Sequence, residues 1–197
     1  MPGLNEQTLL NEILQLVDPG TPGHGFPASR SAAITAWSNA YDTYAGAALD
    51  ASDDNLSFGG PSGFASALSS AWSSTWTAAA AASAFSSAFE AYWTGATFAI
   101  GTLISGTGGE CENQGSGTRI FAVELTSIVS VVDGSTLYSE LLNEFEDLDD
   151  QGADKAARIV ACFHRATSAD VLVLISGLDT TPPPTGPLPV TNLCHLF

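Results

Sequence analysis

The sequence predicts a mostly helical α+β protein with Ala/Ser-rich helices and a small β-sheet. Apolar residues recur at helical spacing over much of the chain. Hydrophobic residues make up 45% of the 197 positions, which is enough for a buried core. The apolar run 171–175 is typical of a strand that is buried on both faces. We therefore expect a single domain over residues 1–179. Its helical part covers about 29–95 and its mixed part about 96–179, and an extended tail follows at 180–197.

Residues 5–17 form the first predicted helix. Leu9 and Ile13 are four positions apart, as on one face of a helix. Pro19 ends this helix because its ring cannot continue helical hydrogen bonding. The Pro- and Gly-rich residues 18–28 are expected to form an extended arm.

Aromatic residues mark the next helical segments. A helix is predicted at about 29–49, and an Ala/Ser-rich segment follows at 62–93. The aromatic row of the second segment drifts around a straight helix, so this segment either breaks near 78–83 or is buried on several sides. We predict that aromatic side chains of both segments contact neighbouring subunits: Trp37, Tyr41, Trp72, Trp76 and Trp93.

The second half of the domain is predicted to mix strands and helices. Residues 98–104 favour a short strand, and a Gly-rich loop follows. Residues 119–132 fit a helix face and a β-branched strand equally well. Amphipathic helices are expected at 133–147 and at about 153–165, before the buried strand.

The C-terminal tail begins with a Pro-rich run and ends in apolar residues. The run TTPPPTGP cannot start a helix and favours an extended chain. Leu196 and Phe197 provide an apolar end, which we expect to dock on a neighbouring subunit.

The charge balance excludes several kinds of partner. The chain has 21 acidic and five basic residues, for a net charge of −16. Nucleic acids and anionic membranes bind basic surfaces, so neither is an expected partner. Lys155, Arg158 and Arg165 form the one local basic group where such contact would arise. The segment 55–109 holds a single charge, Glu90, but it is rich in Ala, Ser, Thr and Gly and lacks basic flanks, so stable membrane insertion is not expected.

Candidate metal ligands have unsuitable spacing. An EF-hand loop starting at Asp147 would place Arg158 where a bidentate Glu is required. Cys162 and His164 are two apart, so on a helix they point in different directions. The adjacent pair formed by Cys194 and the following histidine is not a usual zinc spacing either. The sequence therefore predicts no metal and no cofactor.

The three cysteines and the N-terminus bear on the compartment. An odd, sparse set of cysteines is not a disulfide framework, and whether Cys111, Cys162 or Cys194 pair stays open. No Lys or Arg precedes Arg30, so the basic region of a signal peptide is missing. We expect a chain that matures in cytoplasm.

No motif identifies an enzyme. The chain has no Gly-x-Ser-x-Gly elbow, and its single lysine, Lys155, does not follow a glycine-rich phosphate loop. An acyl hydrolase stays open only because serine is abundant. A non-enzymatic protein is the prediction.

Three features together resemble small structural proteins encoded in tailed-phage and contractile-tail gene clusters. They are the Ala/Ser-rich helix pair with interleaved Trp and Tyr, the Tyr-Trp-Thr-Gly helix end at 92–95, and the helix-strand-proline run at 153–189. This resemblance implies a neck, tail or baseplate subunit that assembles as a homo-oligomer with other virion proteins, located in a virion that forms in the host cytoplasm. The alternative is a membrane-active or secreted helical effector built on residues 62–104.

Overall fold

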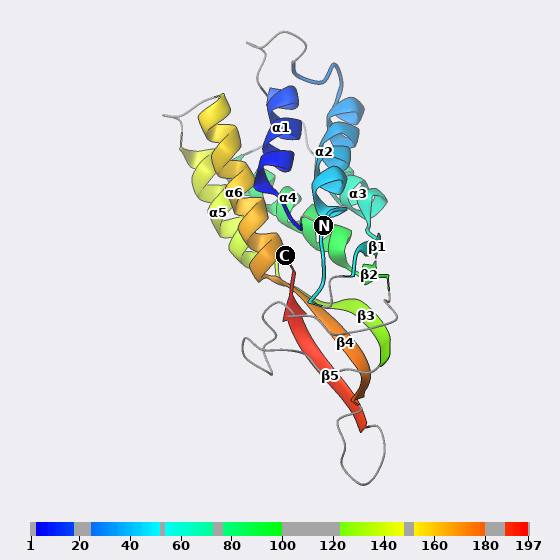
Figure 1. Ribbon diagram of the computed structural model, residues 1–197. Helices are drawn as coiled ribbons and strands as arrows, with labels where there is room; N and C mark the ends of the chain where they lie inside the picture. Colours follow the sequence, from blue (N-terminus) through cyan, green and yellow to red (C-terminus); the bar gives the residue numbers. More distant parts are fainter. Residues whose placement is uncertain are drawn as a thin grey trace.

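Figure 1 shows the fold of the chain, a computed structural model. The described residues are 3–17, 25–51, 54–72, 77–99, 123–147, 152–179 and 188–196. Within them the chain forms six helices: α1 (Glu6–Val17), α2 (Arg30–Ala45), α3 (Pro61–Ala71), α4 (Ala78–Trp93), α5 (Ser135–Glu146) and α6 (Ala153–Ala169). Five strands belong to one antiparallel sheet: β1 (Leu56–Phe58), β2 (Thr97–Phe98), β3 (Val123–Val132), β4 (Val171–Asp179) and β5 (Leu188–His195). The predicted α+β class with mostly helical content is confirmed.

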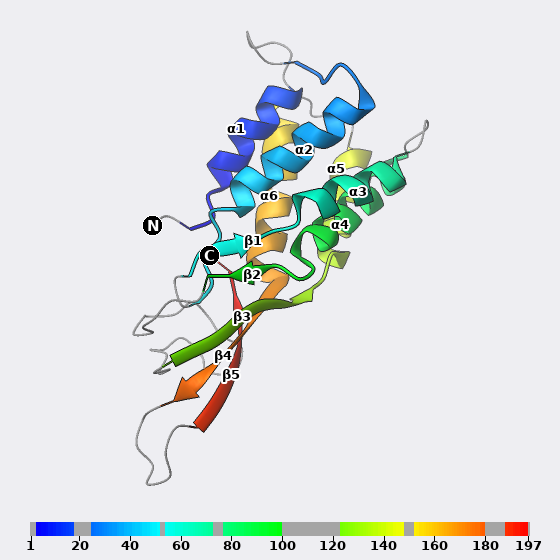
Figure 2. The ribbon, with the colours of Figure 1, turned by 90° about the vertical axis from the view of Figure 1, so that its right-hand side faces the viewer.

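The helices gather at one end of the molecule, and strands β3 to β5 project from the other end (Figures 1 and 2). Strand order in the sheet follows chain order, from β1 to β5. The helical hairpin of α5 and α6 connects β3 to its antiparallel neighbour β4. In the described residues, no helix is long and apolar enough to cross a membrane.

The first two helices match the sequence pattern closely. Helix α1 buries Leu9 and Ile13, the pair that predicted its apolar face. Helix α2 begins after Ser29, whose side chain accepts a hydrogen bond from the backbone N–H of Ala32. This contact satisfies one of the free N–H groups in the first turn. Of the predicted arm, residues 18–24 lie outside the described residues.

The long Ala/Ser segment breaks into two helices, earlier than the predicted 78–83. Helix α3 ends at Trp72, whose backbone is extended, and α4 starts after Thr77, which caps the Ala80 N–H. The two helices pack closely because α3 carries a glycine at the contact. A Cβ added to Gly63 would lie 2.6 Å from the Ala91 carbonyl oxygen of α4.

The ambiguous segment at 119–132 forms a strand where it is described. Strand β3 pairs along its length with β4, so tertiary pairing decides between the two patterns. The side of β3 that faces the helices carries Ser127 and Val129, which are both buried. The Ser127 hydroxyl donates to the carboxylate of Asp50, which is fully buried in the loop after α2. This bond joins the sheet to the helical part.

The second half of the predicted tail is extended but docks on its own chain, not on a neighbouring subunit as predicted. Residues Leu188–His195 form β5, which pairs with β4 over eight register positions. Leu196 then enters the core of its own chain and is 3% exposed. Alternating backbone hydrogen bonds to β4 hold this segment, so it does not extend as an arm toward another subunit. Phe197 and the Pro-rich start of the tail lie outside the described residues.

Candidate interaction surface

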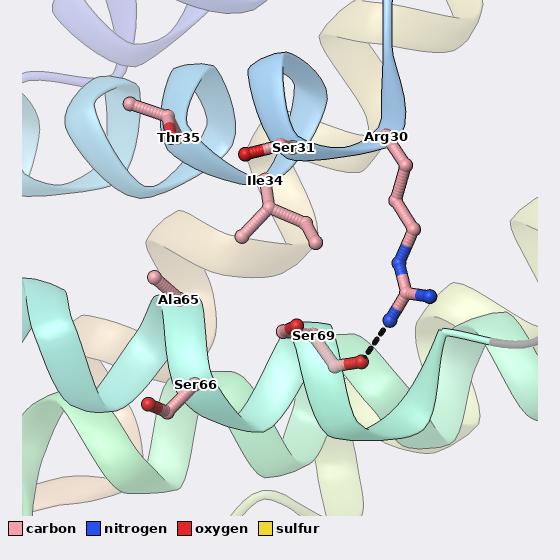
Figure 3. A pocket seen from close by; sticks show the side chains of 7 residues that line it. All are labelled: Arg30, Ser31, Ile34, Thr35, Ala65, Ser66 and Ser69. Carbon is pink, nitrogen blue, oxygen red and sulfur yellow. Dashed lines mark hydrogen bonds between the residues drawn. The ribbon is translucent and has the colours of Figure 1, made fainter.

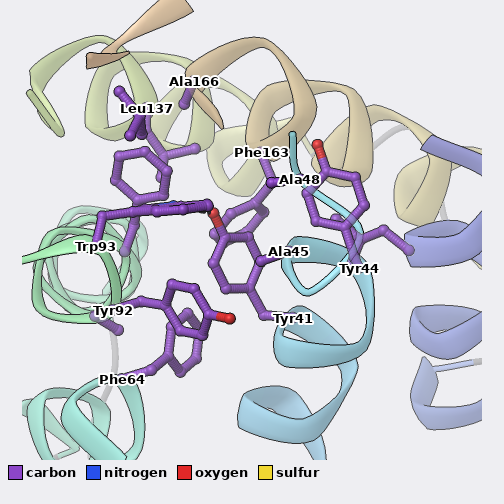
Figure 4. Packing of buried hydrophobic residues seen from close by; sticks show 14 of the residues in the cluster. Tyr41, Tyr44, Ala45, Ala48, Phe64, Tyr92, Trp93, Leu137, Phe163 and Ala166 are labelled. Atoms are coloured by element: carbon purple, nitrogen blue, oxygen red, sulfur yellow. Dashed lines mark hydrogen bonds between the residues drawn. The ribbon is translucent and has the colours of Figure 1, made fainter. Parts of the chain in front are cut away.

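Three of the predicted subunit contacts are core residues: Leu196, described above, and the aromatic residues Tyr41 and Trp93. Tyr41 is 2% exposed and Trp93 is fully buried, so neither side chain is available to a partner. Tyr41 lies at the centre of an aromatic cluster (Figure 4). Its ring stacks on Phe64 with centroids 5.3 Å apart and meets the edge of Tyr92 at 5.0 Å. The prediction that these two residues contact another subunit is therefore corrected: their large apolar rings form the protein's own core.

A chain of hydrogen bonds runs through this cluster. The Trp93 Nε1–H donates to the Tyr41 hydroxyl at 2.7 Å, and the Thr167 hydroxyl donates to the Phe163 carbonyl at 2.8 Å. The Tyr41 and Thr167 oxygens are 2.8 Å apart. Because the Thr167 proton is already used, Tyr41 donates to Thr167. The chain links α4, α2 and α6. Burial raises the pKa of Tyr41 well above its usual value, partly offset by these hydrogen bonds, so the hydroxyl stays a neutral donor.

The other predicted contact residues are either half-buried or lie outside the described residues. Trp37 and Trp72 are half-buried and pack against the core. The ring of Trp37 meets Phe85 of α4 with centroids 4.8 Å apart. Trp76 lies outside the described residues, as does Phe197. The structure thus does not bring the predicted contact residues together in one exposed patch.

The acidic helix end and the basic group are paired with each other. Arg158 on α6 donates to Glu144 at 2.7 Å and to Asp147 at 2.9 Å. Arg165 lies 3.0 Å from Glu140 on α5. These contacts leave the expected local basic patch neutralised by carboxylates. They also hold α5 against α6.

Cys162 and His164 make separate structural contacts. Cys162 is buried, and burial together with the negative charge of Glu140 raises the pKa of its thiol to about 12. A thiol of this kind is a poor nucleophile at neutral pH. The Nδ1 of His164 lies 2.7 Å from the Tyr44 hydroxyl. Within the described ranges, no three His, Cys, Asp or Glu side chains lie close enough to hold a metal ion. Cys194 takes part in a disulfide bond, which the sequence left open.

A polar groove of about 290 Å³ lies between the start of α2 and the end of α3 (Figure 3). Arg30 and four hydroxyl-bearing side chains line it together with Ile34 and Ala65. The Arg30 guanidinium donates to the Ser69 carbonyl in the last turn of α3. Carbonyls at a helix C-terminus lack partners within the helix, and an arginine is a common cap for them. Arg30 therefore joins two helices.

The strongest candidate for contact with a partner is the side of β3 and β4 that faces away from the helices, here called the outer face. Directly opposed residues in an antiparallel sheet point to the same side. Val129, Val173 and Cys194 pair across the sheet and are buried, so they define the inner side. The neighbouring row points outward and is apolar across three strands, from β3 to β5: Ile128, Leu174 and Leu193.

The outer face combines exposed apolar side chains with an absence of charge along its apolar row. Ile128 is 38% exposed, and Val131, which pairs with Leu172 one row further along β3, is 41% exposed. Leu174 and Leu193 are half-buried. The polar residues that continue the face along β3 and β4 are Thr126 and Ser176, which carry no charge. The apolar row therefore places no carboxylate on this face, although the chain has 21 acidic residues.

Sequence reasoning missed the outer face because the segment 119–132 matched two patterns. On a helix, Ile128 belongs to the buried stripe. On a strand, it alternates with the buried Ser127 and Val129 and points outward. Pairing with β4 and its register determine which side of the sheet Ile128 occupies, and no local sequence pattern supplies that information.

Comparison with known proteins identifies no relative: no family model, no curated protein and no solved structure matches the chain.

Proposed function

We propose that this chain is a non-enzymatic structural subunit of a phage virion or contractile-tail particle, assembling as a homo-oligomer with other virion proteins. The outer face is the observation that carries the assembly role. It presents Ile128 and Val131 on a hydrogen-bonded strand, so binding a partner there costs less ordering entropy than binding on a flexible segment. The virion setting rests on the compositional resemblance of the helix pair and of the run at 153–189.

Charge supports a contact between like subunits. Two copies with a net charge of −16 repel each other unless their contact excludes acidic groups. The outer face meets this condition. Covering the exposed part of Ile128 and Val131 stabilises a contact by about 0.5–1 kcal/mol per side chain, since full burial is worth about 1.5–3 kcal/mol. Such a contact is weak for one pair and becomes effective when it is repeated around a closed assembly.

The experiment compares the size of the native chain with that of a double variant, Ile128→Thr together with Val131→Thr, by sedimentation velocity. Threonine keeps the β-branched shape and removes the apolar character of the face. The control is Phe26→Ser, which removes an apolar side chain that is 70% exposed and lies outside the sheet. We expect the native chain and the control to form the same oligomer and the double variant to form a smaller species.

A native chain that stays monomeric throughout the micromolar range contradicts the assembly role. If that monomer also floats with liposomes, the membrane-active effector replaces the structural subunit. The virion setting has its own test, which is detection of the chain by mass spectrometry in particles purified from the producing culture. Its absence from such particles contradicts that setting.

A further inference from the structure

Strand β5 forms one edge of the described sheet. It pairs with β4 at eight successive positions, from Leu188 to His195, with no break in register. It is the last strand in the sheet order, and no other described strand pairs with it. Alternate N–H and C=O groups of β5 therefore point away from β4, in an even row along the strand.

This edge lacks most of the features that keep edge strands from pairing. Proteins usually protect an edge by a charged residue, a bulge, a proline or a very short strand. The sequence LPVTNLCH contains no Asp, Glu, Lys or Arg, and its pairing with β4 shows no bulge. Pro189 is the single protective residue and stands near the start of the strand. The opposite edge, β1, is protected by its length of three residues and its irregular register.

We propose that the β5 strands of two copies pair antiparallel and join two five-stranded sheets into one continuous sheet. This inference rests on the proposed homo-oligomeric function and names one contact of the assembly. Pro189 has no N–H to donate, so regular pairing is confined to residues 190–195. An antiparallel match of this segment with itself places the two-fold axis at a residue that pairs with its own copy, which is Asn192 or Leu193 at the middle of the segment.

A second copy fits this edge better than a partner of opposite charge. A partner of opposite charge is recognised through charged side chains, and β5 contains no Asp, Glu, Lys or Arg. The uncharged edge instead lets two molecules of net charge −16 meet without placing carboxylates against each other. Antiparallel pairing of identical strands is self-complementary, as a two-fold contact requires.

Pairing through β5 leaves the outer face free, because edge contacts lie in the plane of the sheet and the face lies across it. The subunit then has two separate contact surfaces. A single two-fold contact ends at a dimer, whereas a second surface allows those dimers to build a larger closed assembly.

The test introduces a charge into the edge. In Thr191→Lys, the lysine acts as the protective residue that β5 lacks. The control, Thr35→Lys, changes the net charge equally at an exposed position on α2. We expect Thr191→Lys to weaken self-association by about tenfold or more in Kd, whereas the control leaves it nearly unchanged. Association of the native chain is expected to tighten at higher ionic strength, because salt screens the repulsion between copies.

Amide exchange of the native chain gives a second readout that needs no variant. In the free subunit, only the amides of β5 that point to β4 are protected, so protection alternates along the strand. In the assembly, both sets are protected over residues 190–195. If the chain assembles while Thr191→Lys has no effect and protection still alternates, β5 pairing is wrong and the homo-oligomer stands. If Thr191→Lys fails to fold, the exchange pattern decides alone. A native chain that stays monomeric overturns both the β5 pairing and the proposed homo-oligomer.

Discussion

Removing the Tyr41 hydroxyl tests the buried hydrogen-bond chain between α4, α2 and α6. Tyr41→Phe keeps the ring, and with it the contacts to Phe64 and Tyr92. Thr167 still donates to the carbonyl in its own helix. Trp93 is left with an unpartnered donor, because Tyr41 is the one acceptor that its Nε1–H meets among the described residues and Trp93 is fully buried. A buried donor without an acceptor costs about 1–3 kcal/mol, so we expect the free energy of unfolding to fall by that amount.

The measurement is urea unfolding followed by circular dichroism. The matched control is Tyr138→Phe, since Tyr138 is half-buried on α5 and its hydroxyl has no hydrogen bond to any described residue. The control is expected to change stability by less than about 0.5 kcal/mol. In a Trp93→Phe background, the donor is gone and the cost of Tyr41→Phe should largely disappear. A loss below about 0.5 kcal/mol in the native background, or an equal loss in both backgrounds, refutes the reasoning.

Three further predictions concern packing, pH and salt. Gly63→Ala brings a Cβ against the α4 backbone and is expected to cost about 1–3 kcal/mol in urea unfolding, whereas Gly25→Ala, with nothing within 4 Å, has little effect. Burial raises the pKa of Asp170, which ends α6, so the fold binds its proton more tightly than the unfolded chain and loses stability as pH rises above about 4. Asp170→Asn should therefore raise the free energy of unfolding at pH 7, by a few tenths of a kcal/mol up to about 1 kcal/mol, and a gain that persists unchanged below pH 4 contradicts this. Arg158→Met removes two ion pairs to α5 and should cost about 0.5–1 kcal/mol at low salt and less at high salt, and a salt-independent loss points to packing instead.

Local patterns were sufficient for most of the helices. The spacing of Leu9 and Ile13 predicted the buried side of α1, and the amphipathic pattern predicted α5 and α6 with nearly correct bounds. Ser29 is a typical N-cap and marks the start of α2. These features depend on residues within one or two turns of each other, so the sequence alone carries them.

The errors all involve long-range contacts. Aromatic rings at Tyr41 and Trp93 are equally suited to a core and to an interface, and only the packing of α2, α4 and α6 decides between them. The tail has few charges and an extended pattern, which describe both an arm and an edge strand. Pairing with β4 makes this segment an edge strand and not an arm. The candidate contact at Ile128 depends on the register of β3 against β4, which is likewise set by tertiary structure.

The packing of α1 has a consequence during synthesis on the ribosome. Helix α1 packs against α6 as well as α2 (Figures 1 and 2). About 140 residues separate Ile13 from the start of α6 at Ala153. At a translation rate of about 5–20 residues per second, α1 waits roughly 7–30 s for this partner to be made. A twelve-residue helix is marginal alone in water, so Leu9 and Ile13 stay uncovered on that side for the whole interval. The N-terminal half thus cannot finish folding as it emerges, and nascent chains that stop before α6 should be targets for chaperones and proteases.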